Sequence, residues 1–258
     1  MLKSILPTVI VVTILFFSSL SVAENNVKIN NSTKEQRVYL LLGQSNMAGQ
    51  GLVSELSDDI KTLESNITLY LHGKPVSLST LNKFGPEVSF AHEMAKKHLD
   101  SSIHLIKFAP GGSLMKDWTS KDVGKHYDTL IKQVKKSSGG TIPSINGILW
   151  MHGERDTKSK QLADDYEKDL KVFIAMLKSD FKVSKLPIAL ARISIPAAFR
   201  PAVPEVRLAQ EHIAESSSFI HLVSTDDLSK KNDKVHFNSK GQLALGKRFA
   251  QVFMRESH

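Results

Sequence analysis

Residues 40–49 read Leu-Leu-Leu-Gly-Gln-Ser-Asn-Met-Ala-Gly, an apolar run that stops at a glycine and is followed closely by a serine. The run is typical of a buried strand, and ligands in open parallel sheets bind at the carboxyl ends of strands. Ser45, with Gly43 and Gly49 easing the turn around it, is therefore a candidate nucleophile. A helix N-cap is the alternative role for such a serine. The G-x-S-x-G elbow is not matched, because Met47 stands at its final glycine position.

Strand-like runs alternate with amphipathic segments along the rest of the chain. Strands are predicted at residues 37–42, 67–71, 103–108, 145–151, 187–193 and 219–224. Helices are predicted at residues 86–99, 126–137, 161–181, 204–215 and 239–255. This alternation predicts an α/β fold with a parallel sheet covered on both faces. The length of 258 residues suits one such domain, which we place at residues 37–258 because no repeat or Pro/Gly-rich linker divides it.

Two of these helices have further signals. Apolar residues at spacings of three and four give residues 161–181 one apolar face, which predicts a single helix. Ser239 and Gln242 form a capping-box pattern at the start of the last helix, where each side chain can satisfy a free backbone N–H.

Asp233-Lys-Val-His236 stands just before that last helix. A serine nucleophile needs a base to take its proton, and an imidazole base needs a carboxylate to fix its tautomer and stabilise its positive form. Asp233 and His236 can supply both from one short loop. Taken alone, this pattern is common and is equally compatible with a solvated loop.

Two more predicted strands end in residues suited to chemistry. Gly111-Gly112 follows residues 103–108, and paired glycines allow backbone N–H groups to approach a substrate oxygen, although a plain turn has the same pattern. Residues 150–156 read Trp-Met-His-Gly-Glu-Arg-Asp. Their acids and histidine suggest a metal site at first sight, but no recognised ligand spacing completes one, and we expect no metal.

Together these segments resemble the sialate O-acetylesterase and acetylxylan-esterase branch (carbohydrate esterase family six) of the SGNH hydrolases. The resemblance rests on residues 43–49, Gly111-Gly112, Trp150-x-x-Gly-Glu-x-Asp156 and Asp233-x-x-His236 in that order, and extends over residues 37 to about 250. It implies a flavodoxin-like three-layer α/β/α sandwich. It also implies removal of acetyl groups from a sugar, such as an acetylated sialic acid, xylan or another polysaccharide, without a cofactor.

The resemblance further implies roles for individual residues. Ser45 would be the nucleophile, His236 the general base and Asp233 its orienting acid. The oxyanion hole would use N–H groups of Ser45 and of the Gly111-Gly112 pair, together with the side chain at position 152. The family usually has glutamine where this chain has His152, so this chain differs from the family pattern at that donor. The supporting residues would be Gln44, Asn46, Trp150, Glu154 and Asp156.

The N-terminus predicts export. Lys3 precedes an apolar run at residues 5–17, and Ser21-Val-Ala23 follows, which is the pattern of a secretory signal peptide cleaved after Ala23. An uncleaved membrane anchor is the alternative. Residues 24–36 are polar and are interpreted as a flexible leader. We therefore expect a secreted or periplasmic protein.

Composition excludes several classes of protein. There is no cysteine, hence no disulfide, thiol nucleophile or cysteine-ligated zinc. The formal charge is +8, but the lysines are scattered and lack the aromatic interleaving of a nucleic-acid site. Two alternatives stay open: an SGNH lipase or thioesterase acting on other acyl esters, and a non-catalytic sugar-binding module on an esterase fold.

Overall fold

The computed structural model describes residues 34–119 and 126–255, and the chain from Lys34 onward forms one compact unit. Its strands are β1 (Glu35–Gly43), β2 (Gly51–Leu52), β3 (Ile67–Leu71), β4 (Lys74–Val76), β5 (Lys83–Phe84), β6 (Ser101–Phe108), β7 (Gly147–Met151), β8 (Ile188–Ala191) and β9 (Ile220–Val223). A seven-stranded sheet has the order β4-β3-β6-β1-β7-β8-β9, and β2 pairs with β5 separately. The large sheet is parallel except at β4, which runs antiparallel to β3.

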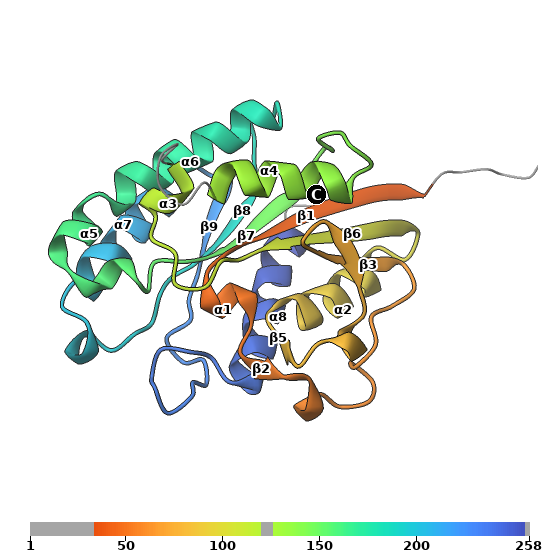
Figure 1. The fold of residues 1–258 in the computed structure, drawn as a ribbon, viewed down its shortest axis with the longest axis horizontal. Helices are drawn as coiled ribbons and strands as arrows, with labels where there is room; N and C mark the ends of the chain where they lie inside the picture. The colour runs from red at the N-terminus through yellow and green to blue at the C-terminus, as the bar shows by residue number, and fades with distance from the viewer. Residues whose placement is uncertain (1–33, 120–125, 256–258) are drawn as a thin grey trace, which may run out of the picture. The chain divides into compact units, whose positions relative to one another are not determined.

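Helices cover both faces of this sheet. They are α1 (Ser45–Ala48), α2 (Glu87–Lys97), α3 (Lys116–Thr119), α4 (His126–Ser137), α5 (Lys160–Asp164), α6 (Tyr166–Asp180), α7 (Val203–Glu215) and α8 (Ser239–Arg255). Short 3₁₀ turns stand at Val53–Glu55, Leu78–Thr80, Asp156–Lys158 and Ala197–Phe199. Figure 1 shows α4 and α6 over one face and α2 and α8 over the other. The fold is thus the predicted three-layer α/β/α sandwich.

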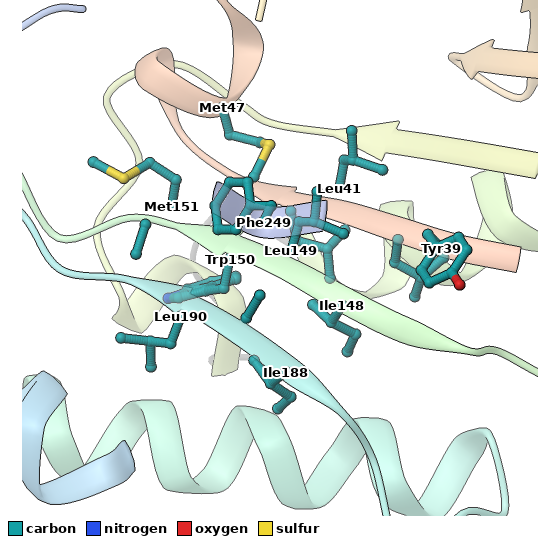
Figure 2. Packing of buried hydrophobic residues seen from close by; sticks show 14 of the residues in the cluster. Tyr39, Leu41, Met47, Ile148, Leu149, Trp150, Met151, Ile188, Leu190 and Phe249 are labelled. Carbon is teal, nitrogen blue, oxygen red and sulfur yellow. The ribbon is translucent and has the colours of Figure 1, made fainter. Parts of the chain in front are cut away.

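The central strand β1 is buried from Val38 to Gly43. Every residue of its neighbour β7 is buried, as expected for a parallel strand covered on both faces. Figure 2 shows Leu41 and Leu149 from these two strands beside Phe249 of α8, with Met47 of α1 close to the same ring. Because Met47 is fully buried, α1 is fixed against the core at the end of β1.

Three sequence-based details were wrong. The predicted helix 161–181 is two helices, α5 and α6, which meet at Asp165. The last helix is capped by Asn238, whose side chain accepts from the N–H of Gly241 at 3.0 Å, so Ser239 and Gln242 form no capping box. The first strand begins at Glu35, inside the segment predicted as leader. The predicted signal peptide lies outside the described residues.

No helix within residues 34–119 and 126–255 is both long and apolar enough to cross a membrane.

Candidate active site

Ser45 stands at the turn between β1 and α1, at the carboxyl end of the central strand. Gly43 makes this turn possible: its φ is 149°, and a Cβ atom there would lie 1.9 Å from the carbonyl oxygen of Met151. The N–H of Gln44 donates to that same oxygen at 3.1 Å, which ties the turn to β7. Any residue larger than glycine at position 43 would push the turn away from the sheet.

The structure brings Ser45, His236 and Asp233 into one hydrogen-bonded chain. Nε2 of His236 lies 3.0 Å from Oγ of Ser45, and Nδ1 of His236 lies 2.7 Å from Oδ2 of Asp233. The other oxygen of Asp233 accepts from the backbone N–H groups of Val235 and His236, both at 2.9 Å. The loop before α8 therefore presents both partners to the serine, in the geometry of a nucleophile, a base and an orienting acid.

The environment keeps Asp233 ionised. Burial pushes its pKa upward, but hydrogen bonds from the N–H and imidazole of His236 and from the N–H of Val235 outweigh it, so the pKa lies below its usual value. The other nearby acids are engaged elsewhere: Asp226 pairs with two arginines, and Asp227 pairs with Arg248. Asp233 is thus the acid that faces His236.

Glu154 connects the segment of the nucleophile to the loop of the base through hydrogen bonds. Its two carboxylate oxygens accept from the side-chain amides of Gln44 at 2.6 Å and Asn46 at 2.5 Å, the two residues flanking Ser45. Asn46 also donates to the carbonyl oxygen of Val235 at 3.1 Å and accepts from the N–H of Phe237 at 3.0 Å. The residues on either side of His236 are therefore held by a neighbour of the serine.

This network is buried, because Glu154 is only 4% exposed. Burial raises the pKa of Glu154, while hydrogen bonds, led by that from Asn46, oppose the rise. Gln242 adds a further hydrogen bond, from its amide to the carbonyl oxygen of Asn46 at 3.1 Å. A carboxylate with two amide donors is a satisfied buried acid, so the network can be rigid without a cation.

The predicted glycine loop follows β6, and only one of its two glycines lines the site. Gly112, with a φ of 69°, lines the pocket beside Ser45 and His236, whereas Gly111 is not part of that lining. The side chain of Arg155 donates to the carbonyl oxygen of Gly112 at 2.5 Å and holds the loop in place. Among the described residues, the N–H of Gly112 has no acceptor and is free to meet a substrate oxygen.

His152 does not line this pocket. It is fully buried, and its ring centroid lies 5.1 Å from that of Trp150 and 6.0 Å from that of Tyr166. Burial lowers its pKa to about 3, so the ring is neutral. The backbone of Ser113 opposes this shift as a hydrogen-bond partner of the ring, but within the described residues neither ring nitrogen makes a hydrogen bond of good geometry. These surroundings argue against the predicted oxyanion donor at this position and favour a packing role beside Trp150.

Asp156 lies in the same buried layer as His152 but away from the serine. One of its oxygens accepts from the N–H of Met115 at 3.0 Å, which fixes the segment after the glycine loop. Its other oxygen is 3.9 Å from Nδ1 of His152, beyond a hydrogen bond. Burial raises the pKa of Asp156 to about 7. No group of three or more His, Asp or Glu in the described ranges could hold a metal ion.

The pocket beside the serine has a volume of about 200 Å³. Its walls include three cationic residues that the sequence did not single out, namely Arg155, Lys158 and Arg200. A larger hollow of about 310 Å³ lies beyond Pro110 and contains no candidate nucleophile. Arg155 lies within a predicted site motif and Lys158 just after it, whereas nothing in the local sequence marks Arg200.

Comparisons with known proteins identify the family and the fold of the chain. The family described as carbohydrate esterase, sialic acid-specific acetylesterase, matches residues 35–255. A probable carbohydrate esterase of Arabidopsis thaliana is 26% identical over 92% of this chain and 97% of its own. A solved structure from Arabidopsis thaliana superposes with a TM-score of 0.72 at 24% identity, over 86% of this chain and 99% of that one. A carbohydrate acetylesterase from Xanthomonas citri gives 0.65 at 16% identity, over 84% of this chain and 55% of that one.

Proposed function

The chain belongs to the carbohydrate esterase family of sialic acid-specific acetylesterases, and we propose that it is an exported serine esterase that removes O-acetyl groups from a carbohydrate. The observation that supports this mechanism best is the unbroken hydrogen-bonded chain from Ser45 through His236 to Asp233. A carbohydrate ester hydrolase needs an activated nucleophile, and the described part of the site offers this one.

In the first half of the proposed reaction, Nε2 of His236 takes the proton of Ser45 while Oγ attacks the acetyl carbonyl carbon. The resulting tetrahedral intermediate collapses, and the sugar oxygen leaves with the proton that His236 returns to it. Asp233, ionised and bonded to Nδ1, stabilises the positive imidazole between these two proton transfers. The acetyl group is then an ester on Ser45.

In the second half, His236 takes a proton from water, and the hydroxide attacks the acetyl ester on Ser45. Acetate leaves, and Ser45 regains its proton. The oxyanion of each intermediate would accept from the backbone N–H groups of Ser45 and Gly112, two residues that line the same pocket. Two preorganised donors suffice for a working oxyanion hole. The side chain of His152 is not required in this scheme.

The proposal of export rests on the N-terminal sequence. Lys3, the apolar run after it and the small residues ending at Ala23 have the order of a cleavable signal. Acetylated polysaccharides of cell walls and cell surfaces are extracellular, so the two parts of the proposal are compatible. Mass spectrometry of the protein recovered from the native host would test it: an N-terminus at Glu24 supports cleavage, and an intact Met1 contradicts it.

Acetate release from a panel of esters tests the activity. The panel contains acetylated sialic acids, acetylated xylan, acetylated bacterial polysaccharides and nitrophenyl esters of acetyl and longer acyl chains. We expect acetate from at least one sugar, and acetyl to be favoured over longer chains. Preference for long acyl chains would indicate a lipase-like or thioesterase-like enzyme. Failure of a fluorophosphonate to label Ser45 would indicate a non-catalytic module.

A further inference from the structure

A hollow of about 310 Å³ lies at the same edge of the sheet as the catalytic serine. Leu71 and Phe108, the last residues of β3 and β6, both line it. In the sheet β6 lies between β3 and β1, and Ser45 stands just beyond the carboxyl end of β1. Neighbouring strands are about 4.8 Å apart, so the hollow begins about one strand away from the nucleophile. Ligands of open parallel sheets bind at this edge.

The hollow and the catalytic pocket share two walls. Helix α1 contributes Ser45 to the pocket and Ala48 to the hollow, and three residues of helix advance by about 4.5 Å. The segment after β6 contributes Pro110 to the hollow and Gly112 to the pocket. A substrate whose acetylated unit occupies the catalytic pocket can therefore place the next unit of its own chain in the hollow.

The walls of the hollow are mainly apolar. Its half-buried apolar lining residues are Ala48, Leu71, Leu81, Phe108, Ala109 and Pro110. The ring of Phe108 packs edge-to-face against Trp118, with the two ring centroids 5.5 Å apart, which fixes its position. Small-molecule sites have this character, with apolar and aromatic walls and a few polar groups that orient the ligand.

Lys107 supplies a buried polar group to this lining. Its side chain is 6% exposed, and its ammonium donates to a carboxylate oxygen of Glu87 at 2.7 Å. The other oxygen of Glu87 accepts from the N–H of Gly85 at 2.8 Å. An ammonium has three N–H groups, and Glu87 is the one hydrogen-bond partner of Lys107 among the described residues. Because the ion pair is neutral as a whole, the spare N–H groups suit the hydroxyl groups of an uncharged sugar.

We propose that this hollow is a subsite for an uncharged sugar unit linked to the acetylated sugar in the catalytic pocket, so that the enzyme prefers oligosaccharides or polysaccharides to free monosaccharides. The ring of the neighbouring sugar packs on Phe108, and its hydroxyl groups bond to Lys107 and to the amide of Gln133, which also lines the hollow. This inference rests on the proposed esterase function and adds to it the size of the substrate and the residues that bind its second unit.

The test compares kcat/KM on acetylated xylose and acetylated xylotriose, on acetylated mannose and acetylated mannotriose, and on nitrophenyl acetate. In at least one of the two sugar series, the trisaccharide should exceed the monosaccharide by about tenfold, the effect of about 1.4 kcal/mol of added binding. Phe108→Leu should lower this ratio by about fivefold, because it removes the aromatic ring but keeps an apolar side chain. Phe108→Tyr should keep the ratio. Gln133→Ala should lower it by about threefold, the effect of one hydrogen bond.

Phe219→Leu and Lys132→Ala are matched controls, one a half-buried phenylalanine before β9 and the other an exposed neighbour of Gln133 on α4. Neither residue lines the hollow or the catalytic pocket, and both variants should leave every ratio unchanged. Equal kcat/KM for trisaccharide and monosaccharide in both series, or an unchanged ratio in Phe108→Leu, overturns the subsite.

Leu81→Trp, which fills the hollow, separates a sugar from an acyl chain as its occupant. We expect it to lower the ratio of trisaccharide to monosaccharide. If it instead lowers activity on nitrophenyl octanoate relative to nitrophenyl acetate and leaves the sugar ratios unchanged, the hollow holds an acyl chain and the proposal is wrong. A wild-type protein without activity on nitrophenyl acetate or on either sugar series would contradict the proposed function itself.

Discussion

Two carboxylates of one short segment, Glu154 and Asp156, have opposite surroundings. Glu154 is bonded through both oxygens and connects the flanks of Ser45 to the loop of His236. Asp156 bonds through one oxygen to Met115 and leaves the other facing His152 at 3.9 Å. The hydrogen bonds of Glu154 position catalytic groups, whereas Asp156 mainly contributes to packing in the buried region around His152. Adjacent motif residues can thus differ in function although they follow the same strand.

The largest effect should come from the hydrogen-bonded chain that Glu154 supports. Ser45→Ala and His236→Ala should each lower kcat on an acetyl ester by on the order of 10⁶-fold, and the double variant should be no worse than either alone, because the residues act as one unit. Steady-state kinetics with circular dichroism as a folding control would measure this. Retention of a tenth of wild-type activity in Ser45→Ala would exclude this serine.

Glu154→Ala should come next. It leaves the amides of Gln44 and Asn46 without their acceptor, and a displacement of about 1 Å at the reacting atoms can lower turnover by about 10²-fold. We expect kcat to fall by that amount with little change in KM.

Glu154→Gln, which keeps one acceptor oxygen, should recover part of this loss. Glu215→Ala, an exposed acid at the end of α7, is the control. Equal losses in the alanine and glutamine variants would show that the charge of Glu154, and not its two hydrogen bonds, is what matters.

Substitutions of His152 should have a small effect on turnover. His152→Ala and His152→Gln should stay within about tenfold of wild type in kcat, because the ring lies outside the pocket lining. His152→Phe should in addition keep the melting temperature, since a phenyl ring can pack among the same aromatic neighbours without burying polar nitrogens. A loss of 10²-fold or more in kcat for His152→Ala, without loss of fold, would restore this side chain as an oxyanion donor.

The smallest effect concerns pH and stability. The pKa of His152 is lowered to about 3 from 6.5, so its contribution to folding is present above pH 6.5 and is lost as the pH falls towards 3. The pKa of Asp156 is raised to about 7, so its contribution is present below its unfolded pKa of roughly 3.9 and is lost as the pH rises to 7. Between roughly pH 4 and 6.5 the two trends oppose each other.

A variant that removes one of these two titrating groups should show the pH dependence of stability that the other group causes. Asp156→Asn should become more stable with rising pH up to 6.5, and His152→Phe should become less stable with rising pH up to about 7. Urea unfolding midpoints at half-unit pH steps would measure both. If the unfolding midpoint depended on pH in the same way in both variants and in the wild type, the shifted pKa values of His152 and Asp156 would be contradicted.

Most of the fold could be predicted from local patterns. The residue ranges of α4, α8 and β3 match their predicted bounds, because long periodic or apolar segments bounded by turns are readable in one sequence. The short elements β2, β4, β5, α1 and α3 were missed, since two to four residues show no period. The break at Asp165 was missed because the apolar face continues across it.

The site was predictable only where its chemistry is local. Asp233 and His236 are three residues apart, and Ser45 follows the end of a strand, so local patterns could mark each as a candidate. Their grouping into one triad was implied by the family resemblance. The bond from Asn46 to Val235 joins residues 189 positions apart, and no local pattern marks it. The burial of His152 depends likewise on Trp118 and Tyr166, which come from other elements.

The position of β1 in the sheet has a consequence for biosynthesis. β1 is the first strand made, yet its partners β6 and β7 end at Phe108 and Met151, so both of its edges are paired only after more than half of the chain has been synthesised. Pairings between distant segments form slowly. A chain whose central strand is paired late stays unfolded for longer during synthesis. Such a delay suits the proposed export, because an exported chain would have to cross a membrane before it folds.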